Sequence, residues 1–335
     1  MFSQIPLGAV VLGAALPFAL AGPLASSKRG LCFVPNTTTP EDDTIWVQKP
    51  TDLTWYYNYD PTPSDVFAKV SQEEFEFVPM LWGVPPTPGD TAFLDTVKGL
   101  IKDGRNITHI MSFNEPDGPA EYGGANADPS AAAQAWVDNI IPLRKMGVKV
   151  GLPACTGSPD GLAWLKTFLD SCSTIVSDGG NKKNCSYDFV PIHWYGDFGG
   201  LASHMGEYSA TFPNKSIWIT EYNFNDQALS TTQDFYNMSA EYFDRLDFVE
   251  RYSLFGAFRS DVSNVGANAA MLNKDGELTD IGAWYLGRPG TGVDPQSGKG
   301  VNGDSKSAGL RAVGVPQIGG VLLGAGFAVG VMMGL

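Results

Sequence analysis

Short runs of apolar and β-branched residues recur along the chain, and stretches with helical periodicity lie between most of them. Such runs predict buried strands, and eight are expected: 30–34, 53–58, 77–82, 107–114, 148–154, 188–195, 217–223 and 252–258. Helices are predicted at 64–75, 91–103, 130–146, 160–177, 231–248 and 277–286, with weaker helical patterns at 41–49 and 199–211.

Strand and helix therefore alternate eight times in about 250 residues, which is typical of a (β/α)8 TIM barrel. A doubly wound sheet is the competing α/β fold, but it usually carries a glycine-rich phosphate turn after an early strand, and no GxGxxG motif follows an early predicted strand. We therefore predict one domain, a TIM barrel spanning residues 30–287.

Both ends of the chain are apolar and predict processing signals. Residues 1–21 resemble a signal peptide ending in "ALA", and Lys28-Arg29 suggests further trimming to 29. Residues 288–309 form a linker rich in Gly and Ser, and the tail 310–335 ends in an uncharged run. This order is typical of a GPI-anchor signal that is removed, and the alternative is a single spanning helix. The candidate attachment residues are Asn302, Ser305 and Ser307.

Composition places the chain outside the cell and argues against one class of partner. The net charge of −14 argues against nucleic acid, whose phosphates need a basic surface. Asn-x-Ser/Thr triplets beside a signal peptide indicate a secreted glycoprotein, here a monomer held at the cell surface or cell wall by a GPI lipid. The triplets begin at Asn36, Asn106, Asn184, Asn214 and Asn237.

The four cysteines divide into a pair and two single thiols. Cys172 and Cys185 flank a Gly/Asn/Lys loop, so we expect a disulfide between them in an oxidising compartment. Cys32 and Cys155 lie on the first and fifth predicted strands, which face each other across the barrel. A disulfide needs Cα atoms within about 7 Å, so we expect these two to be unbonded to each other.

The stretch "SFNEPDG" at 112–118 ends the fourth predicted strand on Asn114 and Glu115. Pro116 prevents the strand from continuing. A carboxylate at the end of a buried strand must be desolvated, paired or in use. A helix N-cap or a loop ion pair would explain it equally well from this stretch alone.

A second carboxylate supplies the missing partner. "WITEYNF" ends the seventh strand on Glu221, and "HWYG" ends the sixth, where His193 and Tyr195 share one face. In a barrel these strand ends meet at one mouth. Two carboxylates beside aromatic residues suit glycoside hydrolysis, in which one protonates the leaving oxygen and the other attacks the sugar or activates water. Asn114 is placed to bond the sugar 2-hydroxyl.

Five motifs in order, "WYYNY", "PMLWG", "FNEPD", "HWYG" and "WITEY", resemble glycoside hydrolase family 128, the fungal and bacterial β-1,3-glucanases of clan A. The resemblance implies an endo-acting, retaining enzyme without a cofactor, with Glu115 as acid/base and Glu221 as nucleophile. It places Asn114, His193 and Tyr195 around the catalytic sugar and the nucleophile. Other matches to cleft positions that would hold the β-1,3-glucan are Tyr56, Asn58 and Trp82.

Several alternatives stay open. The protein could bind wall β-glucan with little turnover, or transfer a glycosyl group to another sugar instead of water. Strand eight offers Phe258 where the wider clan often has Trp. Trp194 and Trp218 have the opposite parity to His193 and Glu221, so we expect them under the helices. Three scattered histidines without ligand spacing predict no metal site.

Overall fold

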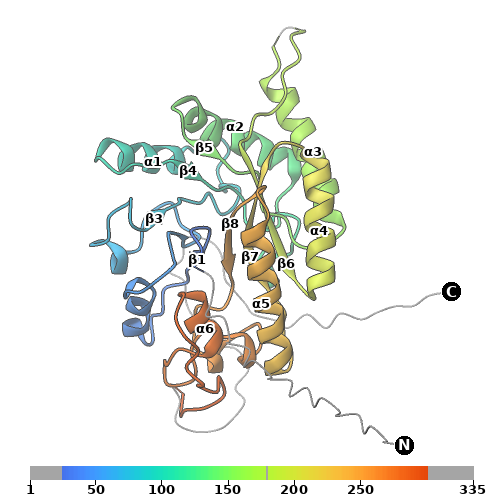
Figure 1. Ribbon diagram of the computed structural model, residues 1–335. Helices are drawn as coiled ribbons and strands as arrows, with labels where there is room; N and C mark the ends of the chain where they lie inside the picture. The colour runs from blue at the N-terminus through green and yellow to red at the C-terminus, as the bar shows by residue number, and fades with distance from the viewer. Residues whose placement is uncertain (1–24, 179, 301–335) are drawn as a thin grey trace, which may run out of the picture.

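A computed structural model describes residues 25–178 and 180–300, so the predicted signal peptide, the predicted anchor tail and the candidate residues Asn302, Ser305 and Ser307 lie outside it. Figure 1 shows the strands at the centre with helices around them. The strands are β1 (Gly30–Cys32), β2 (Trp55–Tyr57), β3 (Glu76–Phe77), β4 (His109–Ile110), β5 (Lys149–Val150), β6 (Phe189–Tyr195), β7 (Ser216–Asn223) and β8 (Val249–Leu254). The α-helices are α1 (Ala92–Lys102), α2 (Pro129–Lys145), α3 (Asp160–Val176), α4 (Phe198–Thr211), α5 (Leu229–Arg245) and α6 (Asp280–Tyr285).

All strand pairs are parallel and form three small sheets, β1-β2-β3, β4-β5 and β6-β7-β8. Isolated parallel bridges connect their edges: Met80 pairs with Met111, Gly151 with Phe189, and Arg29 with Tyr252. Pairing therefore passes from each strand to the next in chain order and returns from β8 to β1. The fold is α/β with parallel strands, in keeping with the predicted alternation.

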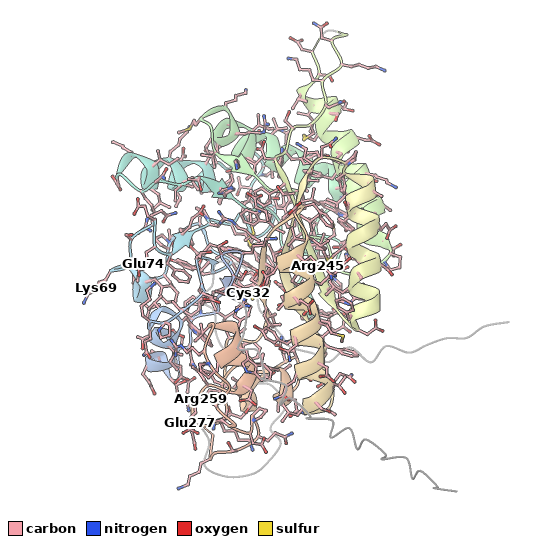
Figure 2. All side chains as sticks on the ribbon, in the orientation of Figure 1. Cys32, Lys69, Glu74, Arg245, Arg259 and Glu277 are labelled. Atoms are coloured by element: carbon pink, nitrogen blue, oxygen red, sulfur yellow. A yellow bond between two sulfur atoms is a disulfide. The ribbon has the colours of Figure 1, made fainter. Side chains whose placement is uncertain are left out.

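Two apolar layers hold the strands. A large cluster packs between the strands and the helices. A smaller set, here the inner cluster, includes side chains from seven of the eight predicted strands and from the loop after β8. It comprises Cys32, Trp55, Tyr57, Val78, Met80, Met111, Phe189, Trp218, Phe255, Val265 and Ala269. Cys32 lies among the central strands (Figure 2) and, like Cys155, is a buried free thiol, as expected.

The helix predicted at 64–75 is wrong. Only a short 3-10 turn, η2 (Asp65–Phe67), forms there. Phe67 and Phe75 both pack on Tyr56, with their own ring centroids 5.2 Å apart. Eight residues of α-helix would separate them by about 12 Å, so the chain folds back to bring both rings onto β2. The segment 41–49 is likewise a 3-10 helix, η1 (Pro40–Val47), whereas 199–211 is a regular helix, α4.

The remaining elements follow the predicted order with shifted ends. The eighth strand begins at Val249 and ends at Leu254, so Phe258 lies in the following loop. That loop contains η4 (Ser260–Val262) and η5 (Ala267–Ala269), and the loop after β4 contains η3 (Ala120–Tyr122). The Cys172–Cys185 disulfide joins the end of α3 to the segment before β6, as predicted. Within the described residues, no helix is long and apolar enough to cross a membrane.

Candidate active site

Glu115 follows β4 in a left-handed conformation, with φ of 42°. The backbone around it is fully bonded: its amide donates to the Ala154 carbonyl at 2.7 Å, and its carbonyl accepts from Gly118 at 2.9 Å. Gly124 lies so close that an added Cβ would sit 2.7 Å from the Glu115 oxygen. A non-glycine residue with positive φ costs on the order of 1–3 kcal/mol and is held only by such surroundings. These backbone contacts therefore hold Glu115 in a strained conformation and fix the direction of its side chain.

His193, near the end of β6, contacts Glu115 directly. Its Nδ1 lies 2.9 Å from Glu115 Oε1 and 3.6 Å from Glu221 Oε2. The imidazole is 1% exposed, so both contacts are shielded from water. His193 therefore connects the two glutamates that the sequence placed on different strands.

Glu221, on β7, accepts hydrogen bonds at both carboxylate oxygens. Tyr195 donates to Oε2 at 2.6 Å, and Tyr59 donates to Oε1 at 2.8 Å. The Tyr57 hydroxyl lies 3.5 Å from Oε1 but donates mainly to the Thr220 carbonyl, at 2.9 Å. The ionised carboxylate is thus held in one orientation by two strong charge-assisted bonds.

Burial and charge separate the protonation states of these groups. Burial raises the pKa of Glu115, and the nearby charge of Glu221 adds to this, while His193 opposes it. Burial lowers the pKa of His193, but the Glu221 and Glu115 carboxylates outweigh that effect and raise it. Burial also raises the pKa of Tyr59 and Tyr195 well above the ordinary value, so both hydroxyls stay protonated donors. The site therefore holds Glu115, whose pKa is raised, beside Glu221, whose carboxylate accepts hydrogen bonds from two tyrosines.

One ligand atom each from Glu115, His193 and Glu221 lie within 4.8 Å of one another. These are the residues of the described chain that could hold a metal ion. The same geometry, with the pKa of one carboxyl raised by burial and the other carboxylate held by two tyrosine hydroxyls, is also that of acid–nucleophile pairs in glycosidases. The absence of a metal stays a prediction.

Asn114 keeps one buried polar atom without a protein partner. Its Nδ2 donates to the Gly123 carbonyl at 3.1 Å, which fixes the orientation of the amide because a carbonyl can only accept. Within the described chain, Oδ1 is buried and makes no hydrogen bond. An unsatisfied buried acceptor costs about 1–3 kcal/mol, so this atom is suited to a hydroxyl donor from a ligand.

The prediction that Tyr56 lines the cleft does not fit the structure, whereas a cleft role for Asn58 stays a prediction. Tyr56 is buried in the outer layer with Phe67, Phe75 and Phe77, because its side chain points away from the inner cluster. Asn58 closes its own turn by donating to the Thr62 carbonyl at 3.0 Å.

The residues missed from the same strand are Tyr57 and Tyr59, which have the opposite parity. The alternation of "WYYNY" contained this information, but aromatic residues on both faces hid which face was inward. The chain then turns at Tyr59, whose φ is 62°.

Two further aromatic predictions have different outcomes. Trp194 lies under α4, with its ring 5.3 Å from that of His204, as expected. Trp218 does not lie under the helices but belongs to the inner cluster, because register shifts interrupt the alternation of β7 before Glu221.

Trp82 and Phe258 remain beside the site. The Trp82 carbonyl accepts from the Asn114 amide at 2.8 Å, and its side chain is half-buried. A role for Trp82 in sugar stacking stays a prediction. Phe258 is partly buried against the inner cluster, with its ring centroid 5.5 Å from that of Phe255.

The five predicted glycosylation sites all lie in described segments. Asn36 is half-buried, and its Nδ2 donates to Thr39 at 2.5 Å. The side chains of Asn106, Asn184, Asn214 and Asn237 are exposed. Their modification stays a prediction.

Comparisons with known proteins agree with this geometry. The family model described as "Glycosyl hydrolase catalytic core" matches residues 30–285. A curated relative, Alkali-sensitive linkage protein 1 of Schizosaccharomyces pombe, is 29% identical over 270 residues. That alignment covers 78% of this chain but 44% of the relative, so the chain spans less than half the relative's length.

Two solved structures of glycoside hydrolase family 128 are also similar. One is a curdlan-specific exo-β-1,3-glucanase from Blastomyces gilchristii, 26% identical with a TM-score of 0.58, covering 79% of this chain and 99% of that one. The other is an endo-β-1,3-glucanase from Pseudomonas viridiflava, 25% identical with a TM-score of 0.61 and the same coverage.

Proposed function

The chain belongs to the glycosyl hydrolase catalytic core family, glycoside hydrolase family 128, and from this premise we propose that it is a retaining endo-β-1,3-glucanase. The observation that carries the proposal is the pair Glu115 and Glu221, whose oxygens lie within 4.8 Å with His193 between them. Retaining glycosidases place their carboxyls about 5–5.5 Å apart, whereas inverting ones need about 6.5–9.5 Å to admit water. The short separation favours direct attack by Glu221.

In the first step, a Glu221 oxygen bonds to the anomeric carbon while the glycosidic bond breaks. The electron pair goes to the leaving oxygen, which takes the proton of Glu115. If His193 Nδ1–H donates to Glu115 Oε1, the acid proton lies on Oε2, free to reach that oxygen. In the second step, Glu115 takes a proton from water, and the water oxygen attacks the anomeric carbon and releases Glu221. No cofactor is needed.

The sugar in the site would be held by groups already described. The free Oδ1 of Asn114 accepts from the 2-hydroxyl, a bond that strengthens as charge develops at the anomeric carbon. Tyr195 and Tyr59 keep Glu221 oriented until attack. Because the glucan is uncharged, the net charge of −14 on the protein does not oppose its binding.

The larger setting is part of the proposal. Strand pairing that passes from β1 through β8 and returns supports a closed (β/α)8 barrel for residues 30–287. We place this domain outside the cell, after removal of residues 1–21 and of the tail 310–335, on a GPI lipid. Release of the protein from membranes by a phosphatidylinositol-specific phospholipase tests the anchor. An intact mass that still includes the tail contradicts it.

The catalytic proposal is tested with the secreted domain and laminarin. Reducing-sugar release by the wild type, abolished in Glu221→Gln while laminarihexaose still binds, is the expected result. Glu115→Ala should still react with an aryl glucoside bearing a good leaving group, and azide should rescue it with retained configuration, because that substrate needs no acid.

Three outcomes would redirect the proposal. An inverted product would make Glu221 a base rather than a nucleophile. Binding of laminarihexaose without release after long incubation would indicate a glucan-binding protein. Products longer than the substrate would identify a transglycosylase.

A further inference from the structure

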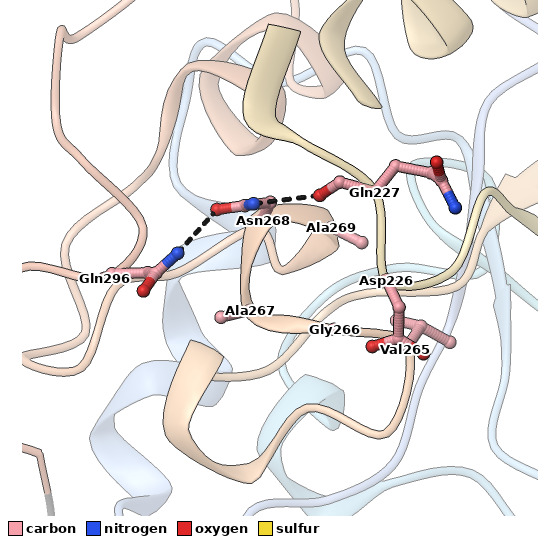
Figure 3. A pocket seen from close by; sticks show the side chains of 8 residues that line it. All are labelled: Asp226, Gln227, Val265, Gly266, Ala267, Asn268, Ala269 and Gln296. Carbon is pink, nitrogen blue, oxygen red and sulfur yellow. Dashed lines mark hydrogen bonds between the residues drawn. The ribbon is translucent and has the colours of Figure 1, made fainter. Parts of the chain in front are cut away.

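A separate hollow of about 160 Å³ lies on the side of β7 and β8, and neither glutamate lines it. Its walls come from the loop after β7, from η5 and the residues before it, and from the turn at 294–297 (Figure 3). Asp226 follows Glu221 by five positions, just beyond the end of β7. The hollow therefore opens at the same end of the strands as the glutamates.

A series of packed side chains connects the hollow with the glutamates. Val265 and Ala269, which line the hollow, belong to the inner cluster together with Phe255. The Phe255 ring packs edge-on against Tyr195, at 5.9 Å, and Tyr195 donates to Glu221. Asn223, two positions after Glu221, ties the wall together by donating to Phe255 and Ala269 carbonyls. The contacts from the hollow to Glu221 therefore pass through the inner cluster, including Phe255, and then through Tyr195.

Each side-chain amide that lines the hollow uses one of its two N–H donors within the protein. Gln296 Nε2 donates to Asn268 Oδ1, Asn268 Nδ2 to the Gln227 carbonyl, and Gln227 Nε2 to the Asn225 carbonyl (Figure 3 draws the first two). In the described part of the chain, the Asp226 carboxylate and the Oε1 atoms of Gln227 and Gln296 accept no hydrogen bond. The hollow thus offers free acceptors and one remaining N–H on each amide, so it requires a ligand that both donates and accepts hydrogen bonds.

Neutral hydroxyl groups fit this demand better than ions do. One carboxylate repels anions, and a single acidic side chain without His or Cys is a poor ligand set for a metal. The volume is well below the roughly 300–1,000 Å³ of pockets for drug-sized ligands, so it suits one ring rather than a chain. Ala267 adds a small apolar contact for the C–H face of such a ring.

We propose that this hollow binds one glucosyl unit of the glucan, distinct from the unit at the glutamates, through hydroxyls that donate to Asp226, Gln227 and Gln296. The inference rests on the proposed function. Because the hollow opens at the same end of the strands as the glutamates, a chain that crosses the glutamates could place a distal unit or a side branch in it. Occupancy would then favour longer or branched chains over short ones.

Binding is measured calorimetrically in the Glu221→Gln background, with laminarihexaose and laminaribiose as probes. Gln296→Ala removes one exposed acceptor, and Ala267→Trp fills the hollow. Each substitution should weaken the binding of laminarihexaose about three- to tenfold, as expected for one or two lost hydrogen bonds. The affinity for laminaribiose should stay unchanged. Gln134→Ala, exposed on α2, is the matched control and should change neither affinity. Thermal denaturation checks that each variant is folded.

Laminarihexaose affinities within twofold of the control overturn the inference, as do equal losses for both probes. So does calcium binding that Asp226→Asn abolishes without an effect on laminarihexaose. Wild-type enzyme that cleaves laminarin while the variants bind normally refutes only the second site. If the variants lose laminarihexaose affinity but the wild type does not cleave laminarin, only the proposed enzymatic function is refuted.

Discussion

Tyr59→Phe isolates the hydrogen bond that the sequence did not reveal. The hydroxyl donates at 2.8 Å to Oε1 of Glu221, which is 7% exposed, and the substitution keeps the ring and its packing. A hydrogen bond to a charged group contributes about 1.5–3 kcal/mol. Without it the carboxylate loses one of its two strong donors and can rotate away from the line of attack. We expect kcat/KM to fall about ten- to a hundredfold.

The same strand provides the controls for this prediction. Tyr56→Phe removes a hydroxyl in the outer layer and should leave hydrolysis of laminarin unchanged. Tyr57→Phe removes a hydroxyl that donates mainly to the Thr220 carbonyl and should have an intermediate effect. Initial rates over a range of laminarin concentrations separate kcat from KM, and thermal denaturation reports folding. If folded Tyr59→Phe is within twofold of Tyr56→Phe, the reasoning about Glu221 is refuted.

Three other predictions concern the acid, its supporting loop and the disulfide. Because the pKa of Glu115 is raised, activity should persist above the ordinary glutamate pKa of about 4.3 and fall as pH rises through the raised pKa. The measurement is kcat/KM as a function of pH. A decline of kcat/KM on the alkaline side that is centred at or below about pH 4.3 contradicts the prediction. Gly124→Ala places a Cβ 2.3 Å from a backbone oxygen, so it should lower the free energy of unfolding by about 1–3 kcal/mol and reduce activity. Gly206→Ala is the control, because its added Cβ meets nothing within 4 Å and should not destabilise the protein. Urea denaturation compares the two variants. Replacing both Cys172 and Cys185 by Ser should lower stability by about 3 kcal/mol, and an unchanged urea midpoint would argue against it.

The sequence predicted the strand ends that form the candidate site because those ends are marked by residue type. "FNEPD" combines a buried strand, an amide, a carboxylate and a proline that stops the strand. His193 and Tyr195 share a face on β6, a strand that keeps its alternation over this pair, so parity placed both correctly. Long, regular helices such as α2 and α5 were also predicted within a few residues.

Other features depended on contacts that a local pattern does not contain. β7 carries register shifts, so counting by two from Glu221 put Trp218 on the wrong face. On β2, both faces are aromatic, and only packing against Phe67 and Phe75 shows that Tyr56 is the outward residue. Tyr59 reaches Glu221 across 162 positions, a contact that no single segment predicts.

The left-handed backbone at Glu115 has a consequence for how this protein would respond to selection. The residue combines a strained φ with a mostly buried carboxyl, and both features cost stability. Glycine or asparagine there would relax the backbone and remove the buried acid, so it should raise the melting temperature while it abolishes turnover. A library enriched only for heat resistance should therefore accumulate inactive proteins changed at this position. Activity and robustness are opposed at one residue, and the remaining fold supplies the surplus stability that lets glutamate persist there.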